Sequence, residues 1–538
     1  MSTKRREFFK SSSALALSSA VSPEIFADFM QSKTQPNKGS WDQGTVRHIL
    51  PTVNDTQMLI KVSFNDLQSK PPILKIGTRK VIGKMEDTEG ECWSFYQDNL
   101  VPNKEYLLNL TSSSGKSLCE TWPLKTFPAP QEQTKNFRLF IYTCAGGHEM
   151  HGFLPSKVRN QLLKRGLSFK PDAVIANGDH VYWDLLAPVG STLFAKRPES
   201  IAYAGSYERS SQVLGTSNED VLKKAAGSQI TPVYGTDLRS TPVFFLQDDH
   251  DYFDNDEATD EVITFPPSYF MMQLARSTQS LYYPEFLADK GRPLGLPWSS
   301  AKDKAAGVSE SFGTLRFGNL AEILLYDVRR SQTLAGPSAV YLDPEVERWL
   351  NYRTTSSSVK HVVHVPSNPP GWTAGKWGEW YGDVLGKDGK LTIQEKKPYW
   401  QEGWLKQHDR IMTAIHSKQD RIPLVISGDL HAIALGDMHR SGKLDFSKNP
   451  INVLLSGPIG SRPGPNGWPS GRRGTGAKPS LYLDFVEEIS PIEQHGFTIV
   501  DFTQDEIKIQ MFKWDIKTQS VADIDQLQPF HTKVLSKK

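Results

Sequence analysis

Short apolar segments separated by turn residues make up the first part of the chain. Five of them alternate or run apolar in the way typical of short β-strands: "QMLIKVSF" (57–64), "PILKIG" (72–77), "ECWSFYQ" (91–97), "KEYLLNL" (104–110) and "ETWPLKTF" (120–127). Their spacing predicts an N-terminal β-sandwich domain over residues 40–128. The polar, Pro-rich "PAPQEQT" (128–134) then predicts a linker, which we place at 129–135.

After the linker, apolar runs alternate with helical segments, so residues 136–538 are predicted to form a second domain of the α/β or α+β class. "SKVRNQLLKRG" (156–166) is amphipathic and ends at a glycine. "DPEVERWLNY" (343–352) begins with Asp343, a good N-cap residue. "EGWLKQHDRIMTAIHSK" (402–418) places four apolar residues on one helical face: Leu405, Ile411, Met412 and Ile415.

Five apolar runs after the linker end in residues that could bind a metal or an anion. Their endings are Cys144; Asp179; Asp248, Asp249, His250 and Asp251; Asp327, Arg329 and Arg330; and Asp429 and His431. Ligands of open α/β sheets lie beyond the carboxyl ends of the strands. One such ending would be an ordinary turn with an Asp cap. Five of them are more than solvation requires, so we expect them to converge on one site.

Several converging carboxylates would repel one another unless cations bind them, and two metal ions are the simplest resolution. Two metal ions about 3.5–4 Å apart can clamp an in-line displacement at phosphorus. In this interpretation Asp179 bridges the two metals, while Asp429 and His431 bind them from another loop. Arg329 would grip a phosphoryl oxygen of the substrate.

Other chemistries have weaker support in the sequence. "HEMH" (148–151) lacks the spacing of a helical zinc pair, and His361 and His364 lie on opposite sides of their strand. Neither a Gly-x-Ser-x-Gly elbow nor a Walker phosphate loop stands out. Three aromatic residues of a later loop either line a substrate cleft or pack the loop itself: Trp372, Trp377 and Trp380.

The length of 538 residues allows two or three domains. The 62 Lys and Arg residues nearly balance the 60 Asp and Glu residues, so we expect no broad nucleic-acid-binding patch. No apolar run is long enough to span a bilayer, so we expect no stable membrane anchor. Of the three cysteines, Cys92 and Cys119 either form a disulfide or stay free. Cys144 is the remaining single thiol, which indicates a role in the chemistry of the protein.

The first residues have the order of a twin-arginine export signal. Lys4, Arg5 and Arg6 precede two phenylalanines and a stretch of small, mildly apolar residues. The alternative is a basic, frayed N-terminus without a targeting role. We assign residues 1–35 to the export signal and a disordered start; Ala20 is a candidate cleavage position, and the sequence leaves the cleavage site open. The predicted location is therefore the periplasm or the extracellular space, and the twin-arginine export machinery is a predicted partner.

Five motifs in order resemble the PhoD-like alkaline phosphatases and phosphodiesterases of the calcineurin-like metallophosphatase superfamily. They are "TCAGG" (143–147), "NGDHVYWD" (177–184), "QDDHDYF" (247–253), "YDVRRSQT" (326–333) and "SGDLHA" (427–432). The resemblance covers about residues 40–520. It implies an α+β fold in which a four-layer α/β/β/α metallophosphatase catalytic domain follows a fibronectin/Ig-like β-sandwich.

The same resemblance implies metal ligands at six positions: Cys144, Asp179, Tyr182, Asp249, Asp429 and His431. Cys144 and Tyr182 would hold Fe³⁺ and the carboxylates would hold Ca²⁺, with Mn²⁺ or Zn²⁺ as other divalent candidates. His250 and Arg329 would be the catalytic residues, with His250 protonating the leaving group or stabilising the transition state.

The chain departs from the family pattern at three positions. Gln247 stands where the family usually has Trp, Trp183 where it has Glu, and Ala145 where it has a polar residue. These changes affect the substrate and the surroundings of the ligands more than the metal site. His180, beside Asp179, is expected to orient its neighbours or fill the pocket wall rather than bind a metal.

The sequence therefore predicts an exported metal-dependent phosphoric ester hydrolase of the alkaline phosphatase D type. It would hydrolyse phosphate mono- or diesters by in-line attack of a metal-bound water or hydroxide. The substrate would be a small phosphate ester or a phosphodiester polymer. Two alternatives stay open: a phospholipase D-like activity, and an exported, non-catalytic cell-surface binding protein with a degenerate metal site.

Overall fold

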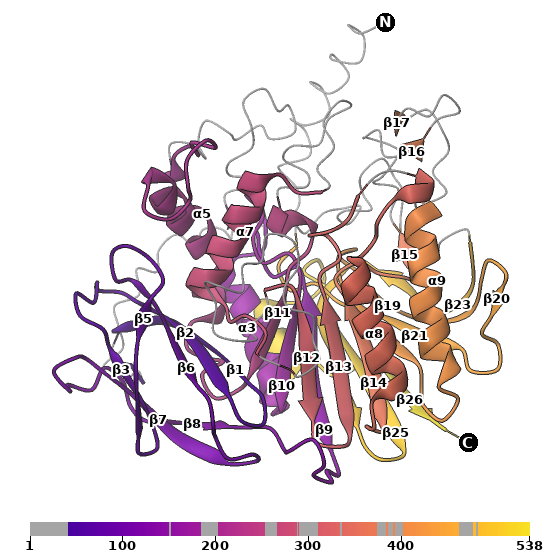
Figure 1. Cartoon of the computed structure of the whole chain (residues 1–538), viewed down its shortest axis with the longest axis horizontal. Coiled ribbons are helices and arrows are strands. Elements are labelled where there is room, and N and C mark those ends of the chain that lie inside the picture. The colour runs from indigo at the N-terminus through magenta and orange to yellow at the C-terminus, as the bar shows by residue number, and fades with distance from the viewer. Residues whose placement is uncertain are drawn as a thin grey trace, which may run out of the picture.

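A computed structural model describes most of the chain (Figure 1). The described residues are 41–42, 44–149, 152–183, 203–252, 266–287, 289, 310–333, 336–373, 384–385, 391–392, 402–461, 477–479 and 482–537. The predicted export signal, His151, Trp377 and Trp380 lie outside these ranges. Within them, no helix combines the length and the apolar character needed to cross a membrane.

Residues 46–125 form two four-stranded antiparallel sheets. One has the order β1 (Val46–Val53), β2 (Met58–Phe64), β6 (Cys92–Gln97) and β5 (Lys84–Met85); the other has the order β4 (Arg79–Ile82), β3 (Ile73–Ile76), β7 (Glu105–Thr111) and β8 (Trp122–Lys125). All five predicted strands are present. Ile60 of the first sheet and Leu108 of the second belong to the same buried cluster, so the sheets share a core.

A six-stranded mixed sheet follows the linker. Its order is β11 (Val243–Leu246), β10 (Ala173–Asn177), β9 (Phe137–Thr143), β24 (His495–Phe502), β25 (Glu506–Trp514) and β26 (His531–Ser536). The strands β9, β10 and β11 are parallel to one another, whereas β24 and β25 add antiparallel neighbours. The carboxyl ends of three parallel strands therefore lie at one edge of the sheet.

An eight-stranded sheet forms the next layer. Its order is β12 (Phe312–Phe317), β13 (Ala321–Tyr326), β14 (His361–Pro366), β18 (Leu424–Ser427), β21 (Ile451–Ser456), β19 (Ile433–Ser441) and β20 (Leu444–Asp445), and β23 (Leu483–Ile492) also pairs with β19. Two small ladders join β15 (Trp372–Thr373) to β22 (Lys478–Pro479) and β16 (Val384–Leu385) to β17 (Leu391–Thr392). The strands β13, β14 and β18 are parallel, so their carboxyl ends also share an edge.

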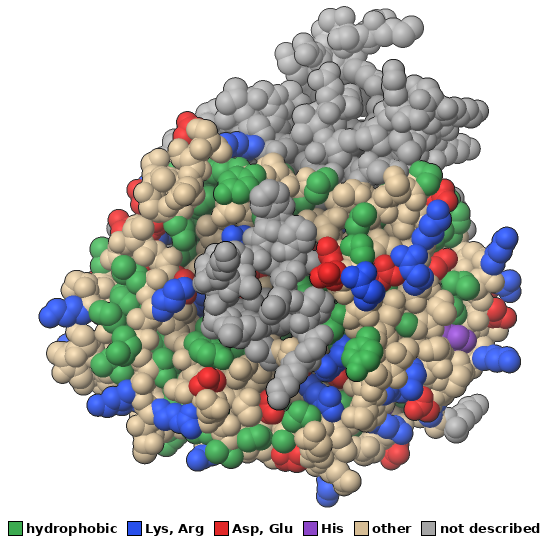
Figure 2. Space-filling view, in the orientation of Figure 1, with side chains coloured by type: hydrophobic (Ala, Val, Ile, Leu, Met, Phe, Trp, Pro, Cys, Tyr) green, Lys and Arg blue, Asp and Glu red, His purple; other side chains and the backbone are tan. Residues whose placement is uncertain are grey.

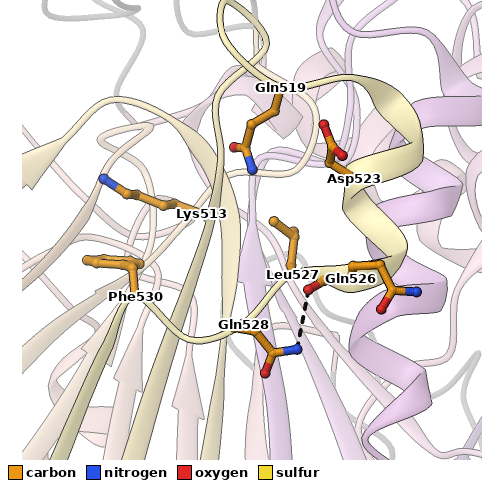
Figure 3. A pocket seen from close by; sticks show the side chains of 7 residues that line it. All are labelled: Lys513, Gln519, Asp523, Gln526, Leu527, Gln528 and Phe530. Atoms are coloured by element: carbon orange, nitrogen blue, oxygen red, sulfur yellow. Dashed lines mark hydrogen bonds between the residues drawn. The ribbon is translucent and has the colours of Figure 1, made fainter.

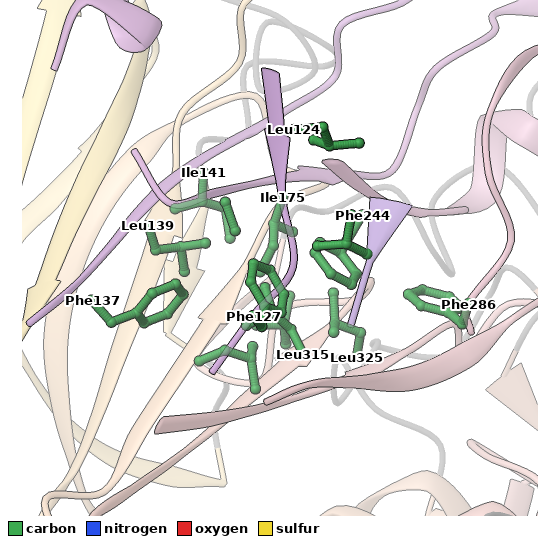
Figure 4. Packing of buried hydrophobic residues seen from close by; sticks show 14 of the residues in the cluster. Leu124, Phe127, Phe137, Leu139, Ile141, Ile175, Phe244, Phe286, Leu315 and Leu325 are labelled. Atoms are coloured by element: carbon green, nitrogen blue, oxygen red, sulfur yellow. The ribbon is translucent and has the colours of Figure 1, made fainter. Parts of the chain in front are cut away.

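The alternation of side chains along the strands explains how these sheets pack. Leu139 and Ile141 of β9 lie in the same buried cluster as Ile323 of β13, whereas Phe140 between them belongs to a different cluster. Successive side chains of a strand point to opposite faces, so the two large sheets face each other across the first cluster. Figure 4 shows this cluster, with residues from β9, β10 and β13 in contact.

Helices cover the outer faces of both large sheets. The cluster containing Phe140 includes residues of α3 (Ser156–Ser168), α5 (Ser217–Tyr234) and α7 (Tyr269–Tyr282). A third cluster joins the other face of the eight-stranded sheet to α8 (Pro344–Ser356) and α9 (Glu402–Ser417). The mixed α/β class is confirmed by this arrangement.

The three predicted helices are present, with small differences. Asp343 caps α8 by accepting a hydrogen bond from the Glu345 backbone N–H at 2.8 Å. The helix α3 continues two residues beyond the predicted end, to Ser168. In α9 the buried face includes Trp404 but leaves Leu405 half-buried, so the predicted apolar face was wrong at that residue.

The disulfide alternative between Cys92 and Cys119 is not realised, because both thiols are free and buried. Cys92 belongs to β6 and packs in the cluster that contains Phe140, whereas Cys119 lies close to β8 in the cluster that contains Leu139. The two side chains therefore pack into different parts of the core.

Candidate metal centre

All eight predicted site residues meet where strands of the two large sheets end. Cys144 follows β9, Asp179 and Tyr182 follow β10, and a short 3-10 helix after β11 carries Asp249 and His250. Arg329 follows β13, and Asp429 and His431 follow β18. Parallel strands bring these ends to one edge, which is why segments almost 300 residues apart supply one cluster.

The first group of donors consists of Cys144, Asp179, Tyr182 and His431. The Tyr182 hydroxyl lies 2.8 Å from Asp179 Oδ2 and 2.7 Å from His431 Nε2. The Cys144 Sγ lies 3.3 Å from Asp179 Oδ2, which is 3.7 Å from His431 Nε2. Asp179 Oδ2 is therefore in contact with a thiol, a phenol and an imidazole, all of them buried.

The second group consists of carboxylates around the Arg329 guanidinium. Arg329 Nε donates to Asp248 Oδ1 at 2.6 Å and Nη2 to Asp429 Oδ2 at 2.8 Å, while Asp249 Oδ1 lies 3.9 Å from Nη2. The carboxylates of Asp248, Asp249 and Asp429 offer oxygens within 4.8 Å of one another. The Arg329 side chain is 1% exposed and that of Asp248 is fully buried, whereas Asp429 is 12% exposed, so solvent reaches this charge contact only at Asp429.

Asp179, Asp249 and His250 link the two groups. Each offers a ligand atom within 4.8 Å of the others, and the His250 backbone N–H points to Asp179 Oδ1 at 3.4 Å. The His250 ring packs on Tyr182 with 4.2 Å between ring centroids. Asp179 therefore occupies the position between both groups that a bridging carboxylate needs.

Four of these residues have backbones in the left-handed region. The φ angles are 49° for Cys144, 56° for Asp179, 66° for Asp429 and 50° for His431. Such conformations cost about 1–3 kcal/mol each in non-glycine residues and persist where the surrounding structure enforces them. Their concentration at one cluster is typical of a functional site rather than of a set of ordinary turns.

Neighbouring loops enforce this backbone. Cys144 N–H donates to the Gly178 carbonyl at 3.1 Å, and Gly146 N–H donates to the Asp179 carbonyl at 2.8 Å. Gly178 itself has a φ of 79°, and a Cβ atom there would lie 2.5 Å from the Asp248 Cβ. Only glycine therefore allows the two acidic loops to approach this closely.

The donor chemistry fits metal binding. Burial raises the pKa of the Cys144 thiol and of the Tyr182 phenol, so both are neutral without a metal. Burial also raises the pKa of the Asp248 carboxyl, and the Arg329 charge opposes that rise. Asp248 Oδ2 is buried and accepts no hydrogen bond from the described residues. A cation would stabilise the charged forms of all three groups.

The two groups of donors suit different ions. Thiolate, phenolate and imidazole ligands around Asp179 suit a transition metal such as iron. Asp249 and Asp429 provide oxygen ligands, which hard cations such as Ca²⁺ prefer. Arg329 already supplies one positive charge to the second group, which reduces the repulsion among its carboxylates.

His180 and Trp372, two residues singled out in the sequence, both lie among packed aromatic side chains. His180 Nε2 lies 2.8 Å from the Leu246 carbonyl oxygen, and its ring packs on Phe245 and Tyr283. Burial lowers the pKa of His180 to about 4. The imidazole therefore packs in the interior beside Asp179 and belongs to none of the groups of described residues that could hold a metal ion. Trp372 is also a packing residue, since it contacts Phe485 and donates to Glu487.

Three further residues around the donors had no predicted role: Gln229, Asp251 and Asn368. Asp251 accepts hydrogen bonds from the backbone of the Asp179 loop, and Asn368 Nδ2 donates to Asp429 Oδ2 at 3.5 Å. Gln229 of α5 accepts from the Tyr182 N–H at 2.9 Å and donates to the Tyr182 carbonyl at 3.0 Å. The run of acidic residues from Asp248 to Asp251 in the sequence indicated that Asp251 lies near the site. Gln229 is distant in sequence from the donors, and no sequence pattern indicated its contact with Tyr182.

Among the described residues, the groups of Cys, His and acidic side chains that could hold a metal ion all lie in this cluster. On the face shown in Figure 2, basic side chains are interspersed with acidic ones. A cavity of about 390 Å³ near the end of the chain is walled by Lys513, Phe530 and the segment 519–528 (Figure 3). None of the eight predicted site residues lines it, so it does not belong to the metal centre.

Comparisons with known proteins agree with this geometry at the level of the fold. A scan against protein-family models and a search of curated proteins found no match. Among solved structures the chain is similar to PhoD, with a TM-score of 0.57 and 14% identity over 93% of this chain and 90% of that chain. A weaker likeness, with a TM-score of 0.31 and 11% identity over 75% of this chain and 90% of the other, is to GAP50, the anchor in the inner membrane complex of Plasmodium. The first likeness shows the fold, and the chain therefore has a PhoD-like fold.

Proposed function

We propose that this protein is an exported, metal-dependent phosphoesterase that hydrolyses phosphate mono- or diesters. One observation carries the proposal: a buried thiol, phenol, imidazole and carboxylate contact one another beside a second group of carboxylates. The PhoD-like fold supports the same activity. A non-catalytic binding protein with a degenerate metal site would be expected to lack some of these donors.

In this proposal Cys144, Asp179, Tyr182 and His431 hold an iron ion, and Asp179 also faces a second cation held by Asp249 and Asp429. The bound metals would neutralise the phosphoryl oxygens and lower the pKa of an attacking water. Asp179 lies between the two donor groups: its Oδ2 contacts Tyr182, and its Oδ1 accepts from the backbone N–H of His250, which follows Asp249.

The remaining residues have roles that follow from their contacts. The His250 imidazole donates a proton to the leaving-group oxygen, since its backbone is bonded to Asp179 and its ring rests on Tyr182. Arg329 Nε and Nη2 are bonded to Asp248 and Asp429. Arg329 therefore orients those two carboxylates, and contact with a phosphoryl oxygen is a second role that its charge would support.

We also propose the finer architecture that the resemblance implies. Residues 136–538 would be a catalytic domain of the four-layer α/β/β/α class, and residues 40–128 a fibronectin/Ig-like sandwich. Residues 1–35 would carry the twin-arginine signal that delivers the folded, metal-loaded protein to the periplasm or the exterior.

The test of the activity uses protein exported by a host that carries the twin-arginine machinery. Release of p-nitrophenol from p-nitrophenyl phosphate and from its bis-ester is measured alongside metal content. The expected result is turnover that chelation abolishes and metal restores, and the ratio of the two rates assigns monoester or diester preference. Fully metallated protein without turnover on either ester would contradict the proposal.

A matched pair of variants tests the metal assignment. Cys144→Ser is expected to lose iron, because it removes the thiol that contacts Asp179. Cys92→Ser is the control, since Cys92 is also a free, buried thiol but lies in β6, in the cluster shared with α5 and α7 and outside the donor groups. Equal iron content in both variants would refute ligation by Cys144.

A further inference from the structure

Asp251 is a buried carboxylate next to the donors but outside the proposed ligand set. It belongs to the 3-10 helix Asp249–Tyr252 and is 3% exposed. Its oxygen Oδ2 accepts from the backbone N–H groups of Asp179 at 3.1 Å and Asp248 at 2.9 Å. Its oxygen Oδ1 accepts from His180 at 3.0 Å and Val181 at 3.1 Å.

These four bonds fill the hydrogen-bond acceptor capacity of the Asp251 side chain. An ionised carboxylate has about four acceptor sites and no donor, so four amides satisfy it completely. Burial raises the pKa of the Asp251 carboxyl, and the backbone N–H donors oppose that rise by stabilising the charged form. The Asp251 carbonyl adds another contact to the same loop, since the Trp183 indole donates to it at 3.4 Å.

The geometry explains why the loop needs such an anchor. Gly178 and Asp179 both have positive φ, and three consecutive amides after Gly178 all point to one residue. The left-handed conformation of Asp179 is unfavourable by itself, so it must be held by its surroundings. The carbonyl groups of this loop bind the Cys144 loop, and its amides bind Asp251.

We propose that Asp251 is the positioning residue of the metal centre: it fixes the Asp179 loop against the loop of Asp248 and Asp249, and thereby sets the direction of the Asp179 carboxylate. This inference rests on the proposed function, because positioning matters only if Asp179 binds metal. Residues that orient metal ligands in this way typically change metal affinity or activity by about 10- to 100-fold when they are replaced.

The test is Asp251→Asn, which keeps the shape of the side chain. One carboxylate oxygen becomes an NH₂ group, so two of the four amides face a donor instead of an acceptor. We expect metal affinity, measured by competition with a chelator, to fall about 10- to 100-fold. We also expect KM at saturating metal to change much less than kcat, because no substrate contact is lost.

The matched control is Asp87→Asn. Asp87 is another buried carboxylate that accepts two backbone bonds, from Gly90 at 3.1 Å and Glu91 at 3.0 Å, in the loop between β5 and β6. It also pairs with Lys223, so its replacement tests a general loss of stability. The control should keep the metal affinity of the wild type even if its unfolding midpoint falls.

Hydrogen exchange of the peptide that contains residues 178–181 provides a readout independent of metal. The amides of Asp179, His180 and Val181 should exchange slowly in the wild type and at least about tenfold faster in Asp251→Asn. Rapid exchange in the wild type would overturn the inference even if the variant cannot be folded.

The outcomes for the two proposals are distinct. Metal affinity and turnover of Asp251→Asn within about threefold of the wild type would overturn the role of Asp251 and leave the phosphoesterase intact. A wild type that neither retains metal nor hydrolyses esters would overturn the proposed function, and with it the reason to call Asp251 a positioning residue.

Discussion

Replacing Arg329 with methionine tests how the carboxylates of the metal centre are held before metal binds. The methionine has a similar length but no charge, so Asp248 and Asp429 lose the cation to which they are bonded at 2.6 and 2.8 Å. Asp248 is fully buried and Arg329 is 1% exposed, so solvent cannot compensate. Breaking a buried ion pair by removing one partner costs about 3–5 kcal/mol.

The cost should depend on pH in a direction that the pKa of Asp248 determines. Burial raises that pKa in the folded state, and Arg329 opposes the rise. The neutral carboxyl therefore favours folding at low pH, and this contribution is lost as the pH rises through the folded pKa. Arg329→Met raises the pKa further, so the deficit of the variant should be smallest in acid and grow toward neutral pH.

The assay is urea unfolding of chelator-treated protein, followed by tryptophan fluorescence at several pH values. The double variant Arg329→Met with Asp248→Asn should recover part of the loss, because the uncompensated charge is then gone as well. A single variant within about 1 kcal/mol of the wild type at neutral pH, the range of an exposed ion pair, would refute the counter-cation role.

Asp179→Asn should lower turnover by several orders of magnitude with little change in the unfolding midpoint, because Asp179 lies between the two donor groups. Ester hydrolysis and thermal unfolding would check this. Tyr182→Phe should shift or bleach the visible charge-transfer band expected of the iron-loaded protein, and an unchanged absorption spectrum would exclude the phenol as a ligand. His250→Ala should slow an alkyl phosphate ester more than p-nitrophenyl phosphate, since only the poor leaving group needs a proton; equal losses in kcat would point to a positional role. Replacing Arg5 and Arg6 with lysine should leave the protein in the cytoplasm, as fractionation and immunoblotting would show.

The positions of the site residues could be predicted from the sequence because strand ends leave a simple signal. An apolar run that ends in Cys144 or in Asp179 needs no knowledge of distant contacts, and parallel strands bring such ends together. The structure gives the positions and contacts of these residues, whereas their roles as metal ligands stay predictions.

The residues that hold the site could not be predicted in the same way. Asp251 and Gln229 act on backbone groups of other loops, and such contacts leave no periodic pattern. Asp248 was visible as one of two consecutive acids, but its partner Arg329 follows 81 residues later. Pairing across such a separation depends on the sheet order, which local patterns do not determine.

The missed elements contain residues that usually interrupt them. The strand β1 includes Pro51, which is compatible with its place at the edge of its sheet. The helix α5 includes Gly227 and Pro232. Gly227 is explained by packing, since a Cβ atom there would lie 2.7 Å from the Tyr282 hydroxyl of α7. In each case a tertiary contact or position overrides the local preference.

The left-handed backbone of the donor residues and their buried carboxylates both destabilise the folded loops, and the same set of hydrogen bonds offsets both effects. Left-handed residues and concentrated negative charge both destabilise a loop, yet here the bonds that hold the loops also neutralise or cap the charges. The carboxylate of Asp251 caps the amides of the Asp179 loop, and Arg329 pairs with Asp248 and Asp429. The candidate metal centre is therefore formed largely by protein contacts, and a metal entering it would meet donors already in place rather than assemble them.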